Sequence, residues 1–175
     1  MKKNVIVFGL ISGAIVSVWM AVSVAICDAS GNFNGNMWVG YASMLLAFSL
    51  VFAGVKNYRD KQNNGLISFG QAFKLGLYIT LIASTMYVLT WLVAYYAFLP
   101  DFMDKYAAHA ISQIQKSGAT AAVIASKIQN INTMKAMYNN PLGVVLLTYM
   151  EILPLGLIIT VITALILKRK TSAAV

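Results

Sequence analysis

Long uninterrupted apolar runs dominate the chain, and four of them are long enough to cross a lipid bilayer. They cover about residues 4–27, 36–55, 71–99 and 142–167. A spanning helix needs about 20 apolar residues for a hydrocarbon core of ~30 Å. Lipid offers the backbone no hydrogen-bond partner, and the runs do not alternate as barrel strands do. Each run therefore predicts a transmembrane α-helix.

Composition favours the same environment. Hydrophobic residues make up 59% of the chain, charged residues only 10%, and the mean hydropathy is +0.74. Soluble domains carry roughly 25% charged residues, so this chain lacks the polar surface needed to face water. Its length of 175 residues predicts a single membrane domain over residues 1–175.

The first run resembles a signal peptide only superficially. Lys2 and Lys3 precede it, but its apolar core is longer than a signal sequence requires, and no Ala-x-Ala site ends it. Cys27 follows the bulky Ile26, unlike the small-residue junctions of lipoprotein sites. We expect an uncleaved helix.

The segment at about residues 101–139 has helical periodicity and predicts a helical hairpin between the third and fourth spans. Asp101 and Asp104 suit the start of its first helix, Gly118 its end, and Thr120 a cap for the second. Apolar residues recur at spacings of three and four on two faces: Met103, Ala107, Ala110, Ile111 and Ile114, then Ile124, Ile128, Ile131, Met134 and Tyr138. These faces can pack on each other, lie on lipid headgroups, or cover the open end of the bundle.

Two local signals concern helix ends and the membrane interface. Ser68 and Gln71 predict a capping box at the start of the third span. An interfacial aromatic belt is predicted on the outer side, made of Trp38, Tyr41, Trp91, Tyr95 and Tyr96.

The distribution of cations predicts the orientation in the membrane. Nine lie on one side of a four-helix topology: Lys2, Lys3, Lys56, Arg59, Lys61, Lys74, Lys168, Arg169 and Lys170. Four lie on the other: Lys105, Lys116, Lys127 and Lys135. Positive charge favours the cytoplasm, so both termini are expected there and the hairpin outside. The net charge of +8 then reflects topology and anionic lipid, and no nucleic-acid partner is expected.

Small residues recur every four positions on three of the spans, a spacing that lets helix backbones approach closely. The alternative is chance, because such residues are common in membrane helices. The candidate helix-packing residues are Gly9, Gly13, Ser17, Gly76, Thr80, Ser84, Gly156 and Thr160.

Glu151 is the candidate functional residue, together with Pro154. Glu151 lies seventeen residues before Lys168, or about 25 Å along a helix, which places it in the outer third of the membrane. Pro154 has no N–H, so the carbonyl of Met150 loses its helical partner. Intramembrane carboxylates are functional candidates by default. The alternatives are a protonated side chain that donates a hydrogen bond to a hydroxyl or carbonyl of a neighbouring helix, and an anchor to the outer hairpin, for instance through one of its lysines.

Three short stretches carry a family resemblance: "GLISFGQAFKLG" at Gly65–Gly76, "PDFMDKY" at Pro100–Tyr106 and "EILPLGLIITVITALILKRK" at Glu151–Lys170. With the rest of the chain they resemble a bacterial membrane-protein family, domain of unknown function 4199. The resemblance implies the same four-helix fold with its outer hairpin. It implies no activity, substrate or catalytic residue.

Three functional classes follow from these observations. We expect an all-α integral protein of the bacterial inner membrane that acts by binding or assembly, with itself or with a membrane-protein partner. The alternative is a small proton- or cation-linked transporter or a channel-forming oligomer that uses Glu151. An enzyme is least expected, because the sequence has no catalytic motif and no paired carboxylates within a span. No metal or cofactor is expected, since His109 is the only histidine and has no ligand cluster around it.

Overall fold

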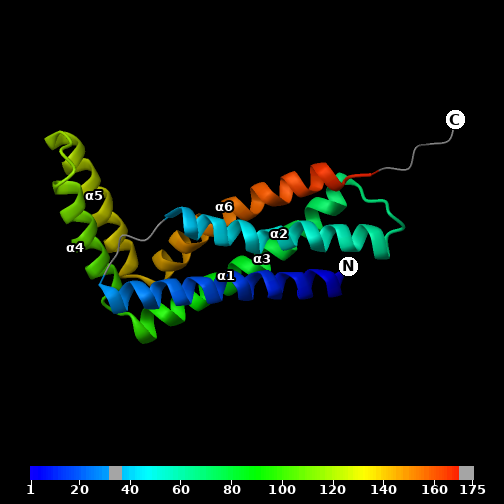
Figure 1. Ribbon diagram of the computed structural model, residues 1–175, viewed down its shortest axis with the longest axis horizontal. Helices are drawn as coiled ribbons and strands as arrows, with labels where there is room; N and C mark the ends of the chain where they lie inside the picture. The colour runs from blue at the N-terminus through cyan, green and yellow to red at the C-terminus, as the bar shows by residue number, and fades with distance from the viewer. Residues whose placement is uncertain (32–36, 170–175) are drawn as a thin grey trace.

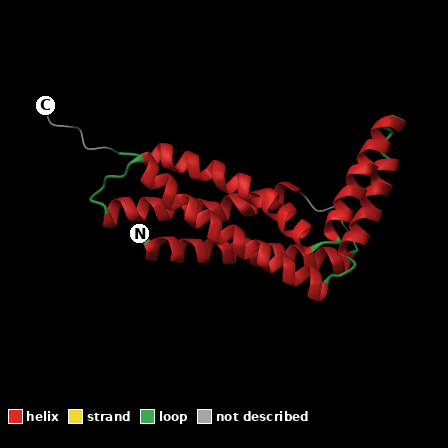
Figure 2. Ribbon diagram, turned by 180° about the vertical axis from the view of Figure 1, so that it is seen from behind, coloured by secondary structure: helices red, strands yellow, loops and turns green. Residues whose placement is uncertain are grey.

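The computed structural model describes residues 1–31 and 37–169, and its regular elements there are all helices (Figures 1 and 2). In chain order they are α1 (Lys2–Ser30), α2 (Met37–Gln62), α3 (Phe69–Val93), the π-helical turn η1 (Ala94–Phe98), α4 (Phe102–Gln115), α5 (Ala121–Tyr138) and α6 (Pro141–Leu167).

The four predicted spans are confirmed as helices that are long and apolar enough to cross a membrane. They are α1, α2, α3 with η1, and α6, and they lie lengthwise in one bundle (Figure 1). The helices extend beyond the apolar runs, most clearly at α2, which ends at Gln62 instead of residue 55. Polar residues such as Lys56 and Lys61 continue this helix, because they can reach water at the membrane surface. Two residues of the sequence argument, Asn36 and Lys170, lie outside the described residues.

The bundle core runs between α1, α2, α3 and α6. Its most enclosed side chains include Phe48, Val51, Leu75, Ile79 and Ile152, each with 0% of its surface exposed. Large apolar side chains also cover the outside of the bundle, among them Val18, Leu46, Leu89, Ile158 and Ile166. Apolar surface on all sides is expected of helices that face lipid.

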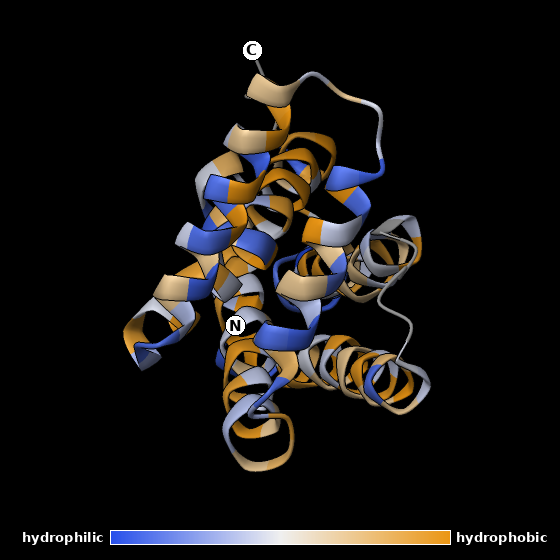
Figure 3. Cartoon of the chain, turned by 90° about the vertical axis from the view of Figure 1, so that its left-hand side faces the viewer, coloured by the Kyte–Doolittle hydropathy of each residue, from blue (hydrophilic) through white to orange (hydrophobic). Residues whose placement is uncertain are grey.

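α4 and α5 stand at the end of the bundle opposite the N-terminus (Figure 1). They pack against each other, and the predicted apolar faces are their less exposed sides. Met103 and Ala107 of α4 are buried as part of the bundle core. Seen along the bundle in Figure 3, this pair mixes hydrophilic and hydrophobic positions. Of the three arrangements considered for the apolar faces, packing on each other and covering the bundle end are both observed.

The helix-end predictions have mixed outcomes. The capping box is confirmed, with Ser68 Oγ accepting from Gln71 N at 3.2 Å and Gln71 Oε1 accepting from Ser68 N at 3.2 Å. Thr120 takes the N-cap position of α5, but its side chain makes no capping hydrogen bond. Gly118 has a φ of +68°, yet it lies two residues beyond the C-cap, Lys116. The chain therefore continues past α4 for one residue more than expected before it turns.

Candidate functional site

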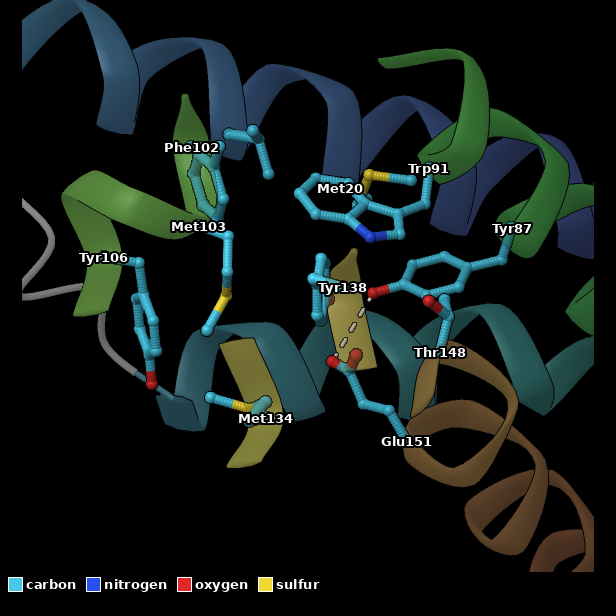
Figure 4. Close-up of a pocket in the computed structure, with 11 residues that line it drawn as sticks. Met20, Tyr87, Trp91, Phe102, Met103, Tyr106, Met134, Tyr138, Thr148 and Glu151 are labelled. Carbon is cyan, nitrogen blue, oxygen red and sulfur yellow. Dashed lines mark hydrogen bonds between the residues drawn. The ribbon is translucent and has the colours of Figure 1, made fainter. Parts of the chain in front are cut away.

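A cavity of about 340 Å³ lies where the bundle meets α4 and α5 (Figure 4). Side chains from five helices line it, so it forms only when the outer helix pair sits on the bundle. The lining residues are Met20 and Val24 of α1, Tyr87 and Trp91 of α3, Phe102, Met103 and Tyr106 of α4, Met134 and Tyr138 of α5, and Thr148 and Glu151 of α6.

Glu151 is the one charged residue among the described residues that line this cavity. Tyr87 Oη donates a hydrogen bond to Glu151 Oε1 at 3.4 Å, and both side chains point into the cavity in Figure 4. A carboxylate has about four acceptor positions. Within the described chain this long hydrogen bond is the one polar contact of Glu151. The carboxylate of Glu151 therefore has free acceptor positions that face the cavity.

The hydrogen-bond partner of Glu151 belongs to α3. Tyr87 lies one helical turn, or about 6 Å, before Trp91 on α3. The hydrogen bond places Glu151 of α6 at the same level of the bundle as Tyr87 of α3. Glu151 does meet a hydroxyl of a neighbouring helix, but Tyr87 is the donor, whereas the expectation was a protonated Glu151 that donates.

Aromatic rings form one wall of the cavity. The Trp91 ring meets Phe102 edge to face, with ring centroids 5.3 Å apart. Tyr95 packs edge to face on Tyr138 at 5.2 Å and lies 5.9 Å from Trp91. Tyr95 belongs to η1, and π-helical turns of this kind frequently occur at functional sites. This turn joins the bundle wall to α5 at the edge of the cavity.

The aromatic-belt prediction is wrong for Trp91 and Tyr95. Only 7% of Trp91 and 8% of Tyr95 is exposed, so both rings face the protein interior. Trp38, Tyr41 and Tyr96 have exposed side chains, as a belt requires. Residue type alone could not separate the exposed rings from the buried ones, because aromatic residues of both kinds lie near the same end of the bundle.

Tyr138 contributes a neutral phenol from α5. Burial raises the pKa of Tyr138 to about 12, while a hydrogen bond from Trp91 acts to lower that pKa and the nearby charge of Glu151 adds to its rise. At physiological pH this side chain therefore keeps its proton and adds no charge to the cavity.

Lys105 and Lys135 of the outer helix pair form ion pairs with other carboxylates, so neither of them is the expected lysine anchor of Glu151. Lys105 Nζ lies 2.8 Å from Asp28 Oδ1, which ties α4 to the end of α1. Lys135 Nζ lies 2.6 Å from Asp104 Oδ1, which ties α5 to α4. Together with the buried Met103, these contacts hold the pair over the bundle end.

Pro154 does not reach the cavity. Its side chain is exposed, and α6 continues through it as one helix from Pro141 to Leu167. Met150, whose carbonyl lacks its usual partner, is 72% exposed. Of the two residues proposed together, only Glu151 lines the site.

The small residues of α1 lie against α3. A Cβ on Gly9 would lie 2.9 Å from Ile82 Cβ, and a Cβ on Gly13 would lie 2.6 Å from Met86 Sδ and 3.2 Å from Ala83 Cα. Ser17, one turn further on, is buried, and its hydroxyl has no hydrogen-bond partner within the described residues.

The small residues of α3 and α6 meet each other. Thr80 Oγ1 lies 2.9 Å from Thr160 Oγ1 in a buried hydrogen bond. A Cβ on Gly76 would lie 3.0 Å from Thr160 Cγ2, and a Cβ on Gly156 would collide with Thr80 Cγ2. Ser84 of α3 is also buried, and its hydroxyl, like that of Ser17, has no hydrogen-bond partner within the described residues. These residues form a helix crossing rather than a ligand site.

Sequence reasoning missed most of the cavity lining. Trp91, Met103, Met134 and Tyr138 were noted only as belt or hairpin residues, and no pattern joined them to Glu151. One signal was available in the sequence. The apolar faces predicted for residues 101–139 and the carboxylate of Glu151 are both expected on the outer side of the membrane. Among the described residues no group of three or more His, Cys, Asp or Glu side chains could hold a metal ion.

Comparison with known proteins identifies the family. No curated protein and no solved structure matches the chain significantly. A family model described as "Protein of unknown function (DUF4199)" matches residues 7–169, which covers α1 from residue 7 onward and all the later helices. The chain therefore belongs to the DUF4199 family.

Proposed function

We propose that this protein is a multi-pass protein of the bacterial inner membrane with both termini in the cytoplasm and with α4 and α5 outside. Charge supports this orientation, because cations favour the cytoplasmic ends of membrane helices. Eight described cations belong to the ends of α1, α2, α3 and α6 that lie away from α4 and α5: Lys2, Lys3, Lys56, Arg59, Lys61, Lys74, Lys168 and Arg169.

The function proposed for it is binding, at the cavity that α4 and α5 close over the bundle. One observation carries this proposal: a carboxylate, Glu151, faces an otherwise uncharged cavity of about 340 Å³. Small-molecule sites are mostly apolar hollows of about 300–1,000 Å³ with a few polar groups. The cavity is within that range, and the hydroxyls of Tyr87 and Tyr138 supplement the carboxylate.

No catalytic reaction is assigned to the site. Acid–base and nucleophilic catalysis combine a reacting group with a positioned partner of matched pKa. Among the described lining residues Glu151 has phenols, a threonine and apolar side chains as neighbours. This set suits recognition better than group transfer.

A second candidate function is transport of a proton or cation. Glu151 favours it, because intramembrane carboxylates commonly mark ion or proton pathways. In that case Glu151→Gln should abolish transport by protein in sealed vesicles while the fold stays intact. Binding without transport predicts no flux in either protein.

The binding proposal is tested by native mass spectrometry of the full chain released from its own membranes. A ligand in the cavity adds a retained mass, which Met134→Trp should remove by filling the space. Val123→Trp, at a 43% exposed position on the same helix, is the matched control and should keep that mass. Absence of any retained mass in the unmodified protein, or its survival in Met134→Trp, would contradict the proposal.

A further inference from the structure

We infer that the ligand of this cavity is an organic cation, an ammonium group that carries apolar substituents. This inference rests on the binding function proposed above and specifies the charge and chemical class of the ligand. It follows from the rings, from the isolated carboxylate and from the apolar remainder of the lining.

Five aromatic side chains line the cavity: Tyr87, Trp91, Phe102, Tyr106 and Tyr138. Aromatic faces attract cations, tryptophan most strongly, and clusters of rings are a recurrent means of holding quaternary ammonium groups. In Figure 4 Tyr87, Trp91 and Tyr138 lie on one side of the Glu151 carboxylate, and the hydroxyl of Tyr87 points toward it. A cation beside Glu151 can therefore contact rings and carboxylate together.

Glu151 has no counter-charge within the described structure. Lys105 and Lys135, both from the outer helices, pair with Asp28 and Asp104 instead. An acidic side chain at membrane depth is costly unless it is neutral or paired. A positively charged ligand would supply the missing partner.

The remaining lining determines the rest of the ligand. Methionine side chains from three helices, Met20, Met103 and Met134, provide an adaptable apolar surface suited to alkyl groups. A hydrated metal ion fits poorly, since Ca²⁺ takes about 6–8 oxygen ligands and the cavity offers one carboxylate. No Lys or Arg is among the described lining residues, so a phospholipid phosphate would lack a partner. These features favour a free organic cation over a lipid amine headgroup.

The test is calorimetry on the purified full chain in nanodiscs of phosphatidylglycerol, which has no amine. The probes are tetraethylammonium, choline, and the uncharged isostere of choline in which carbon replaces nitrogen. We expect both cations to bind about tenfold or more tightly than the isostere. Binding should fall by a similar factor in Glu151→Gln and in Trp91→Leu, and less in Trp91→Phe, which keeps a ring. Asp101→Asn removes a carboxylate that lies outside the cavity and makes no capping hydrogen bond with its side chain, so this variant should bind like the unmodified protein.

Each outcome is informative. Equal affinity for choline and its isostere would overturn the cationic class while leaving the binding function in place. Failure of all three probes would overturn this inference, and the retained mass in native spectra would still decide the binding function separately. In nanodiscs of phosphatidylethanolamine, unchanged affinity supports a free cation. Lost affinity there would assign the site to a lipid amine and overturn the preference for a free ligand.

Discussion

Tyr87 Oη on α3 donates a 3.4 Å hydrogen bond to Glu151 Oε1 on α6, and this contact joins the two helices beside the cavity. It links two helices whose main crossing lies deeper, at Thr80 and Thr160. The polar pair at the cavity and the small-residue crossing below it are therefore separate features, one available to a ligand and the other structural.

Glu151→Gln should leave stability nearly unchanged, within about 0.5 kcal/mol of unfolding free energy, because the amide keeps an acceptor for Tyr87 at similar size. Glu151→Leu should cost about 1 kcal/mol, since the buried Tyr87 hydroxyl loses its partner. Denaturation of each variant in detergent measures both values. A large loss in Glu151→Gln would mean that the carboxylate has a structural role that an amide cannot fill.

Gly13→Leu should lower the melting temperature in detergent, because its side chain would enter the contact of α1 with Met86 and Ala83 on α3. The size of the loss is expected at about 2 kcal/mol, as for other overpacked cores. Gly40→Leu is the control, since a Cβ there meets nothing within 4 Å. Equal melting temperatures for the two variants would count against a close α1–α3 crossing.

Gly143→Ala should disturb the junction of α5 and α6, because the added Cβ would collide with the Met137 carbonyl oxygen and lie 2.9 Å from the carbonyl carbon. Backbone atoms cannot rotate away, so α5 must shift and the cavity must change. Gly70→Ala adds the same methyl group in open space on α3 and should be neutral or stabilising by up to about 1 kcal/mol. Hydrogen exchange across α5 measures the difference. Matching exchange in both variants would show that the junction tolerates a Cβ.

Reporter fusions test the orientation. A fusion at Gly118, between α4 and α5, should report the outer side, and a fusion at Val175 should report the cytoplasm. The reason is the excess of cations at the bundle end away from α4 and α5. An outer reading at Val175 would reverse the orientation, and identical readings at both sites would exclude the single crossing by α6 between them.

The fold could be predicted largely from sequence, because membrane spans depend on local properties. Apolar runs of spanning length identify α1, α2, α3 and α6, and the Ser68–Gln71 capping box marks where α3 begins. The helical periodicity between the third and fourth spans identifies α4 and α5 in the same way.

The cavity could not be predicted, because it depends on how distant helices are placed. Whether Trp91 faces lipid or protein is decided by α4 packing over it, which no local pattern reveals. Gly54 and Gly143 were also overlooked: a Cβ on Gly54 would lie 2.7 Å from Ile79 Cδ1, but no four-residue repeat of small residues drew attention to it. Glu151 could be identified alone, since a carboxylate in an apolar run stands out without tertiary information.

The most direct test of a cation-binding cavity open to the outer side is the labelling rate of a cysteine at position 134. In a Cys27→Ser background, Met134→Cys is treated in spheroplasts with impermeant methanethiosulfonates of similar size, one with a trimethylammonium group and one with a sulfonate. We predict labelling from outside, faster with the cationic reagent, because Glu151 raises the local cation concentration. Val123→Cys should show less of this preference, and Glu151→Gln should remove it at position 134. Labelling at position 134 only after the membrane is opened, or equal rates for both reagents, would contradict the account.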